Sequence, residues 1–380
     1  MINFCVMGDC SQLNCHHCYP VVNCSCGHEF CKKYGTCEEI FSFSNNDKNN
    51  DKNNDKNNDK NINCEHDKKI LVTGCAGFIG SHVCENLLKK KFHVFGIDIL
   101  CDYYDVNIKL KHLKILNEYE NFYFRKDDIC TTKIISEWKP YKIIHLASYA
   151  GVRFSIENPK IYEVNNIGGF INIMEEAVKN NVKNVVYASS SSVYGLNSKL
   201  PFSEDDEITS CNSPYACSKL CMEIYGRMYY QLYKIPNIGL RFFTVYGPRG
   251  RPDMAPYKFL KAIYTNTPFK KFGDGSTSRD YTYIDDIVDG IISASENKNN
   301  IKCNIYNLGN SNPVKLNKFI EICEKITGNN AKYKQYDLQV GDVPHTFADI
   351  SNAKKDLDYN PKINLEEGLY NMLLNDFIKP

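Results

Sequence analysis

The sequence predicts an α/β fold in which a doubly wound parallel sheet carries helices on both faces and is followed by a smaller α/β lobe. Two observations predict this class. From about Asp67 onward, short runs rich in β-branched residues alternate with amphipathic helical patterns, as they do in parallel sheets. A glycine-rich turn also joins the first of these runs to the first helical pattern. With 380 residues, the chain is long enough for two cooperating lobes.

Four apolar runs predict strands of the sheet, and helical patterns lie between them. These runs cover residues 68–73, 92–98, 141–147 and 182–189. After about Arg241 the pattern loosens into loops, short strands and helices, which predicts the smaller lobe at the carboxyl edge of the sheet. We expect the sheet domain to comprise residues 67–243 and 284–310, and the smaller lobe residues 244–283 and 311–380.

Residues 1–66 predict a cysteine-rich leader and a linker. Half of the 18 cysteines lie in the first 64 residues, and paired cysteines with interleaved histidines are typical of structural zinc sites. Cys24 and Cys26 are one residue apart, however, where zinc-binding turns usually have two. A zinc module and a disordered, reactive leader both remain open. The repeated "DKNN" of residues 47–58 predicts a disordered linker.

The charge and hydropathy of the chain exclude several classes of partner. A formal net charge of +1 gives no field that would recruit nucleic acid or an anionic membrane surface. The sequence has no apolar run of the roughly 18 residues that a membrane span needs. Residues 1–10 lack the charged start and apolar block of a signal peptide. We therefore expect a cytoplasmic protein with reduced cysteines.

The glycine-rich turn "VTGCAGFIGSH" predicts a dinucleotide site. Gly74, Gly77 and Gly80 lie between a strand and a helix, where glycine lets the backbone approach a pyrophosphate bound at the positive end of the helix. Asp98 ends the next strand, where a carboxylate accepts hydrogen bonds from ribose hydroxyls and repels a 2′-phosphate. This pattern predicts NAD rather than NADP, although Asp98 could also be a simple strand-end residue.

The segment "SPYACSKL" predicts a tyrosine that acts as a base. Ser213 can cap a helix that Pro214 opens, so that Tyr215 and Lys219 lie one turn apart on one face. A nearby lysine ammonium stabilises a phenolate and lowers the pKa of the phenol. The same spacing recurs at residues 230/234 and 257/261, where we expect only pairs on helix surfaces.

A serine-rich strand exit, "ASSSSVYG", distinguishes Tyr215 from those other tyrosines. It covers residues 188–195 at the end of a predicted strand, and such ends face the ligand in a doubly wound sheet. A serine, a tyrosine and a lysine beside a nicotinamide make a proton relay in which serine orients a substrate hydroxyl and tyrosine takes its proton. A plain polar strand exit is the alternative.

The Gly-x-x-Gly-x-x-Gly spacing resembles that of the extended short-chain dehydrogenase/reductase family, whose sheet domain has the Rossmann-type fold. The resemblance implies that Phe78 and Ile79, between the glycines, belong to the NAD site, and that Tyr215 and Lys219 also contact the cofactor. It also implies that Asp128 and Ile129 of "RKDDIC" contact adenine. In the family pattern the catalytic serine lies four positions before the tyrosine of "VYG", which is Ser190 here.

Residues from about 68 to 374 resemble nucleotide-sugar 4-epimerases, and within them the UDP-glucuronate 4-epimerase family. The resemblance is carried by residues 150–159, 241–256, 273–290 and 341–350. It implies that Tyr215 deprotonates the sugar 4-hydroxyl while NAD accepts the C4 hydride. Related dehydratases and decarboxylating synthases have an acidic residue just before "VYG", whereas this chain has Ser191 and Ser192. The 4-keto sugar is therefore expected to be reduced on its other face, which turns UDP-glucuronate into UDP-galacturonate.

The loop "VYGPRGRPDMAP" is expected to select the substrate. By resemblance, Arg251, Thr244 and the two serines at 191 and 192 occupy positions that bind the C6 carboxylate. A glucose epimerase would have a hydroxymethyl group there and no use for a guanidinium. Arg249 stays unassigned, since it could also lie in solvent or brace the loop.

The remaining residues implied by the resemblance hold the nucleotide. Arg279 matches a diphosphate-binding arginine and Asp342 a uridine-ribose contact, although both could be structural ion pairs. Gln339 replaces an arginine of the glucose epimerases. We expect no metal in the active site, a UDP-sugar as substrate and a possible homodimer. Two alternatives remain: a UDP-glucose or UDP-N-acetylglucosamine 4-epimerase, and a non-catalytic NAD-binding sensor.

Overall fold

The computed structural model describes residues 68–197, 199–338 and 343–378. The chain divides into two units, Met1–Asp59 and Lys60–Pro380, and all described residues belong to the second. The predicted leader and linker therefore lie outside the described residues, as do Gln339 and Asp342. The expectations for these segments stay predictions.

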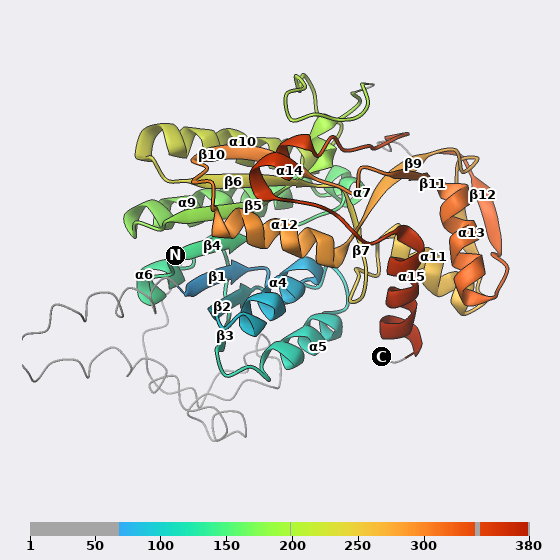
Figure 1. The fold of residues 1–380 in the computed structure, drawn as a ribbon, viewed down its shortest axis with the longest axis horizontal. Coiled ribbons are helices and arrows are strands. Elements are labelled where there is room, and N and C mark those ends of the chain that lie inside the picture. Colours follow the sequence, from blue (N-terminus) through green and yellow to red (C-terminus); the bar gives the residue numbers. More distant parts are fainter. Residues whose placement is uncertain (1–67, 198, 339–342, 379–380) are drawn as a thin grey trace, which may run out of the picture. The chain divides into compact units, whose positions relative to one another are not determined.

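A seven-stranded parallel sheet forms the centre of the second unit (Figure 1). Its strands lie in the order β10-β6-β5-β4-β1-β2-β3, and every neighbouring pair is parallel. Their bounds are β1 Lys69–Thr73, β2 His93–Asp98, β3 Phe122–Lys126, β4 Lys142–His145, β5 Asn184–Ser190, β6 Asn237–Phe242 and β10 Cys303–Leu308. The predicted doubly wound fold is confirmed. The direction of winding reverses between β1 and β4, and a crevice opens at the carboxyl ends of strands at such a point.

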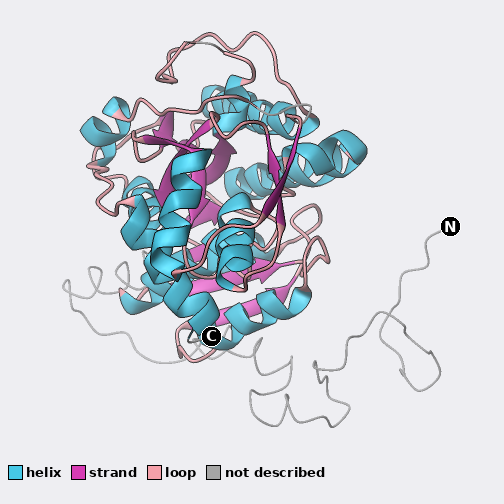
Figure 2. Cartoon of the chain, turned by 90° about the vertical axis from the view of Figure 1, so that its right-hand side faces the viewer, coloured by secondary structure: helices cyan, strands magenta, loops and turns pink. Residues whose placement is uncertain are grey.

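Helices cover both faces of the sheet (Figure 2). One face packs against α4 (Phe78–Lys89), α12 (Ile284–Glu296) and, beyond α4, α5 (Val106–Leu116). The other packs against α10 (Pro214–Tyr233), with α9 (Gly169–Lys179) and α6 (Ile134–Trp138) beside it. Alternate strand residues fill the two cores: Ile70 and Val72 belong to one cluster and Leu71 to the other. This explains why the strands are apolar throughout.

Smaller sheets and helices lie beside the carboxyl edge of the large sheet, on the right of Figure 1. A three-stranded sheet has the order β11-β9-β7 and a two-stranded sheet pairs β12 with β8. The bounds here are β7 Thr244–Tyr246, α11 Ala255–Tyr264, β8 Phe269–Phe272, β9 Ser278–Tyr283, β11 Pro313–Lys315, α13 Leu316–Thr327, β12 Tyr333–Tyr336 and α15 Leu365–Leu373. Strand β10 belongs to the large sheet although it follows β7, β8 and β9 in the chain. The boundaries of the two predicted domains stay a prediction.

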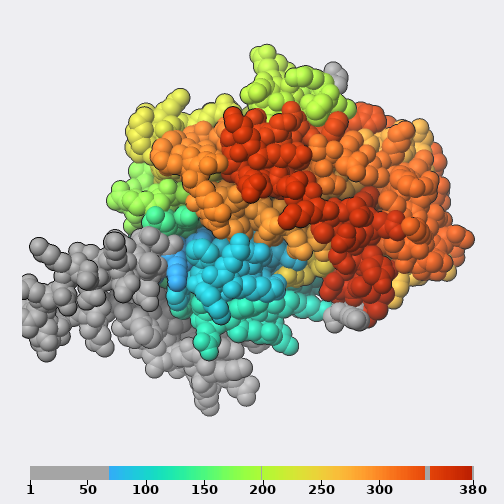
Figure 3. Space-filling model, viewed as in Figure 1, coloured from blue at the N-terminus to red at the C-terminus, as the bar shows by residue number. Residues whose placement is uncertain are grey.

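Short elements connect these layers. They are α7 Val152–Glu157, α8 Pro159–Tyr162, η2 Glu163–Gly168, η3 Ser191–Tyr194, α14 Ser351–Leu357 and η4 Leu374–Ile378. The segment between η3 and α10 projects from the surface at the top of Figure 3. It leads from the serine-rich strand exit to the predicted catalytic helix, and α10 begins where the sequence predicts. There the Ser213 hydroxyl accepts a hydrogen bond from the backbone N–H of Ala216 at 3.2 Å.

A buried ion pair fixes α10 against the sheet. The Arg241 side chain of β6 donates through Nε and NH2 to the two carboxylate oxygens of Glu223, at 2.9 and 2.7 Å. The Ser189 hydroxyl of β5 donates to the same carboxylate at 2.6 Å. The Arg241 guanidinium also lies over the ring of Tyr194, 4.8 Å from its centroid. Arg241 and Glu223 are 1% and 0% exposed, so neither charge has solvent as an alternative partner.

We predict that Glu223→Ala lowers the free energy of unfolding by about 3–5 kcal/mol, because it leaves the Arg241 guanidinium buried and unpaired. Chemical denaturation measures this loss. The matched control removes Glu321, whose ion pair with Lys318 is mostly exposed and should contribute less than about 1 kcal/mol. Equal losses in the two variants would contradict the assignment of Glu223 as an anchor of α10.

Candidate active site

A pocket of about 380 Å³ opens at the carboxyl end of the large sheet, where the strand order reverses. Most of the site residues predicted from the sequence line it. They are Gly74, Gly77, Phe78, Ile79, Gly80, Asp98, Asp128, Ile129, Ser190, Ser191, Ser192, Tyr215, Lys219, Thr244 and Arg251. The fold therefore brings together segments that lie far apart in the sequence, although the role of each residue stays a prediction.

The glycine turn has the shape of a dinucleotide cradle. Gly74 has a φ of +72°, and a Cβ on Gly80 would lie 2.0 Å from the carbonyl oxygen of Gly74. Helix α4 thus begins directly against the turn. Its N-cap is Gly77, which has no side chain, and the first turn of the helix contains no acidic residue. The first turn therefore carries no side-chain carboxylate of its own, and its positive end fits a pyrophosphate.

Asp98 is more than a strand-end residue. Its carboxylate accepts hydrogen bonds from the backbone N–H groups of Ala76, at 3.2 Å, and Leu100, at 2.8 Å. The ammonium of Lys109 lies 3.7 Å away. Asp98 therefore joins the glycine turn to the loop after β2 while it also lines the pocket. These contacts fit the predicted ribose position, since the carboxylate is held in place by neutral and positive groups.

At the other side of the cofactor region, Asp128 accepts a hydrogen bond from the backbone N–H of Cys130 at 2.9 Å, and Ile129 is 8% exposed. Several residues that were not named individually from the sequence also line the pocket: Cys101, Tyr103, Lys109, Ser148, Tyr149, Phe242 and Met254. Lys109 lies on α5 and Phe242 ends β6, whereas Cys101 and Tyr103 belong to the loop after β2. That loop carries no periodic pattern, so only the folded chain reveals its position beside the pocket.

Lys219 is buried at the floor of the pocket. It is 1% exposed, and its ammonium donates to the carbonyl oxygen of Ala188 at 2.8 Å and to the hydroxyl of Ser148 at 3.0 Å. Burial lowers the pKa of Lys219 to about 7. The ammonium lies 5.9 Å from the centroid of the Tyr215 ring. The predicted one-turn spacing therefore places both side chains in the same pocket.

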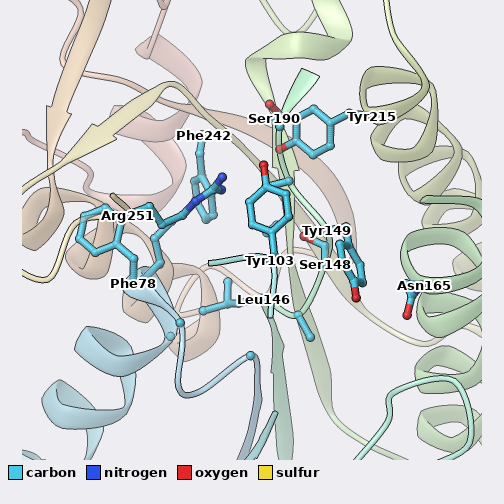
Figure 4. Close-up of a pocket in the computed structure, with 18 of the residues that line it drawn as sticks. Phe78, Tyr103, Leu146, Ser148, Tyr149, Asn165, Ser190, Tyr215, Phe242 and Arg251 are labelled. Carbon is cyan, nitrogen blue, oxygen red and sulfur yellow. The ribbon is translucent and has the colours of Figure 1, made fainter. Parts of the chain in front are cut away.

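Ser190 and Tyr215 lie side by side, with Arg251 across the pocket (Figure 4). Burial raises the pKa of Tyr215, while the hydrogen bond with Ser190 and the positive charge of Arg251 act in the opposite direction. The Ser190 hydroxyl also caps η3 by accepting a hydrogen bond from the backbone N–H of Ser192 at 3.2 Å. The tyrosine thus has both a hydrogen-bonding partner and nearby positive charge, which is the arrangement that a phenolate base requires.

The two arginines of the loop after β7 point to different places. Arg251 lines the pocket, pairs with Asp253 through Nε at 3.0 Å and NH2 at 2.5 Å, and lies over the Tyr103 ring. Arg249 instead donates to Glu85 of α4 at 2.6 Å, and its backbone N–H donates to Asp376 at 2.8 Å. Arg249, unassigned from the sequence, braces the loop against α4 and the C-terminal segment.

Arg279 is not among the residues that line the pocket. It lies on β9, where its NH1 group donates to the carbonyl oxygens of Ser278 at 2.9 Å and Pro344 at 3.2 Å. Pro344 follows the part of the chain that contains Asp342, which the structure does not describe. The predicted diphosphate and uridine contacts of Arg279 and Asp342 stay predictions.

No helix in the described ranges is long and apolar enough to cross a membrane. Over residues 68–378, outside the two short gaps, no group of three or more His, Cys, Asp or Glu side chains is arranged to hold a metal ion. The nine cysteines described there are all free thiols.

The comparisons with known proteins agree on one family. The model of the GDP-mannose 4,6-dehydratase family matches residues 71–372. A UDP-glucuronate 4-epimerase of Thermodesulfobacterium geofontis is 44% identical over 304 residues, which cover 79% of this chain and 93% of the relative.

Two solved structures are also similar. UDP-glucuronic acid 4-epimerase from Bacillus cereus, in complex with UDP-glucuronic acid and NAD, is 37% identical with a TM-score of 0.77, over 80% of this chain and 98% of that one. UDP-glucose 4-epimerase from Thermotoga maritima, with UDP-glucose, is 30% identical with a TM-score of 0.73, over 80% and 97%. With a dinucleotide cradle and a serine–tyrosine–lysine group in one pocket, the chain belongs to the GDP-mannose 4,6-dehydratase family of short-chain dehydrogenase/reductases.

Proposed function

We propose that this protein is an NAD-dependent 4-epimerase that interconverts UDP-glucuronate and UDP-galacturonate through a 4-keto sugar. The observation that carries the proposal is the presence of the Arg251 guanidinium in the same pocket as Ser190, Tyr215 and Lys219. The 4-epimerase of B. cereus, which is similar over 80% of this chain, was solved with UDP-glucuronic acid and NAD. A cation opposite the reacting groups suits a substrate whose C6 is a carboxylate.

The glycine turn and the first turn of α4 would hold the pyrophosphate of NAD, and Asp98 would accept hydrogen bonds from its ribose. Bound NAD supplies the group that takes the hydride from C4 and returns it. The protein supplies the proton chemistry: Tyr215 accepts the proton of the 4-hydroxyl, and Ser190 orients that hydroxyl. A protonated Lys219 favours the phenolate form of Tyr215 through its positive charge.

Epimerisation is favoured over dehydration by the residues of η3. Loss of water needs an additional acid or base near C5 and C6, and Ser191 and Ser192 stand where related dehydratases have a carboxylate. Serine hydroxyls and the hydroxyl of Thr244 can instead donate hydrogen bonds to the C6 carboxylate beside Arg251. The 4-keto sugar then has one productive route, which is reduction from its opposite face.

Other features belong to the proposal but rest on the sequence alone. Arg279 and Asp342 would hold the diphosphate and the uridine ribose. A cytoplasmic location and a homodimer stay predictions. The chief alternative, a 4-epimerase for UDP-glucose or UDP-N-acetylglucosamine, draws support from the similar T. maritima enzyme, whereas a silent NAD-binding sensor would not require Ser190, Tyr215 and Lys219 together.

The substrate can be tested by nuclear magnetic resonance. The purified full-length chain is incubated separately with UDP-glucuronate, UDP-glucose and UDP-N-acetylglucosamine. We expect UDP-galacturonate to form from the first, with much slower turnover of the two neutral sugars. Turnover of UDP-glucose without turnover of UDP-glucuronate would overturn the proposal.

We predict that Tyr215→Phe lowers kcat by about 10²- to 10⁴-fold, the usual contribution of general acid–base catalysis, and leaves the content of bound NAD unchanged. Steady-state kinetics and the absorbance of extracted NAD measure the two effects. Tyr257→Phe is a matched control, because Tyr257 has the same spacing to a lysine, Lys261, on another helix. A loss below tenfold in Tyr215→Phe would exclude this tyrosine as the base.

We predict that Arg251→Ala lowers kcat/KM for UDP-glucuronate by about 10- to 100-fold, as expected when a hydrogen bond to a charged group is lost. The variant should also release some decarboxylated UDP-pentose, because the carboxylate of a β-keto acid leaves when its bond aligns with the carbonyl π system. Chromatography of the nucleotide sugars separates the products. Finding neither change would mean that Arg251 does not contact the carboxylate.

A further inference from the structure

The carboxylate of Asp253 holds the Arg251 guanidinium along one edge. Its Nε and NH2 groups donate to the two oxygens of Asp253, at 3.0 and 2.5 Å. This is a two-point contact with parallel hydrogen bonds, which fixes the plane of the guanidinium as well as its position. Asp253 itself does not line the pocket, so it can act on a substrate only through Arg251.

An aromatic ring fixes the face of the same guanidinium. The central carbon of Arg251 lies 5.3 Å from the centroid of the Tyr103 ring, within the range of a cation–π contact. The Tyr103 hydroxyl donates to Asp253 at 3.4 Å, so the ring contacts both members of the ion pair. Tyr103 belongs to the loop after β2, whereas Arg251 follows β7, and Figure 4 shows the Tyr103 ring next to the Arg251 guanidinium.

Tyr103 is itself fixed by its surroundings. Its ring meets Phe154 of α7 edge to face, with centroids 5.0 Å apart and an interplanar angle of 81°. A Cβ on Gly151 would lie 2.5 Å from the Tyr103 hydroxyl, and Gly151 has a φ of +100°. Glycine at position 151 therefore leaves the space that the Tyr103 hydroxyl occupies, and a larger residue there would fill that space.

These contacts leave a defined set of donors. An arginine has five N–H donors, of which Asp253 takes one on Nε and one on NH2. The two N–H groups of NH1 and the second N–H of NH2 form the outer end of the guanidinium, which is a fork that matches a carboxylate. The Arg251 side chain is 18% exposed, so bulk water competes little with a substrate for these N–H donors.

We propose that Asp253 and Tyr103 are positioning residues that hold the Arg251 guanidinium in one orientation and thereby hold the C6 carboxylate of the 4-keto sugar away from the geometry of decarboxylation. This inference rests on the proposed function. Asp253 fixes the guanidinium along one edge and Tyr103 across its face, so the outer fork meets the carboxylate from one direction.

The reaction that this arrangement prevents can be written in full. In the 4-keto sugar the C5–C6 bond is β to the C4 carbonyl. When this bond lies parallel to the carbonyl π orbitals, it breaks, its electron pair moves to C5 and the carbonyl oxygen as an enolate, and C6 leaves as carbon dioxide. C5 then takes a proton from solvent, which gives a UDP-4-keto-pentose. No external oxidant or reductant is needed for this loss.

The test compares the fraction of decarboxylated product in variants of the full-length enzyme. Asp253→Ala and Tyr103→Leu are each incubated with UDP-glucuronate, and the molar ratio of all UDP-pentose species to UDP-galacturonate is measured by chromatography. We expect the ratio to rise at least threefold in both, with kcat reduced by about tenfold through misplacement of the carboxylate. Asp102→Asn is the control, because it removes one negative charge from the exposed residue next to Tyr103.

The product ratio separates positioning from stability. Partial unfolding lowers the amount of active enzyme and reduces both products equally, so it leaves the ratio unchanged. An unchanged ratio in Asp253→Ala and Tyr103→Leu, with Arg251→Ala raising it, would overturn the inference and leave the proposed function intact. If the wild-type enzyme does not convert UDP-glucuronate at all, the proposed function fails first, and the inference fails with it.

Discussion

The ion pair between Arg241 and Glu223 joins β6 to α10, and it lies next to the residues proposed to carry the reaction. Arg241 comes from β6, Glu223 from α10, and Ser189 of β5 completes the network. Ser190 follows Ser189 directly, and Tyr215 and Lys219 precede Glu223 on the same helix. Because a buried ion pair of this kind tolerates little displacement, it fixes the distance between the serine and the tyrosine. The other residues that line the pocket come from the strands, helices and loops around Ser190 and Tyr215.

Burial, rather than spacing, distinguishes Tyr215 and Lys219 from the two other tyrosine–lysine pairs of the same spacing. Lys219, Lys234 and Lys261 each lie between 5.6 and 5.9 Å from the ring of the tyrosine four residues earlier. Lys234 and Lys261 are exposed, whereas Lys219 is enclosed by the carbonyl oxygen of Ala188 and the hydroxyl of Ser148. An ammonium in water is screened, whereas a charge on a buried ammonium acts on its neighbours through a less polar medium. The same three-dimensional setting lowers the pKa of Lys219 to about 7.

The parts of the site that follow local rules could be predicted from the sequence. The strands, the glycine turn and the cap at Ser213 depend on neighbours in the chain, and the fold class, the NAD cofactor and the epimerase family agree with the comparisons. The partners of the arginines depend on distant segments instead. Arg249 meets Glu85 across 164 residues, so no local pattern could assign it. The sequence around Tyr103 has no helical or strand periodicity. Its contact with Arg251 forms only because the fold brings the loop after β2 against the loop after β7.

In the proposed function, Arg251 links the chemistry at C4 to the choice of substrate. It lies across the pocket from Tyr215, where its charge favours the phenolate, and it would present donors to the C6 carboxylate. The central claim is that C4 is oxidised and reduced again on the same sugar. The most direct measurement uses UDP-glucuronate labelled with deuterium at C4, with the UDP-galacturonate product examined by nuclear magnetic resonance. The account predicts that the deuterium stays at C4 in the product, whereas replacement of the label by hydrogen from solvent would contradict it.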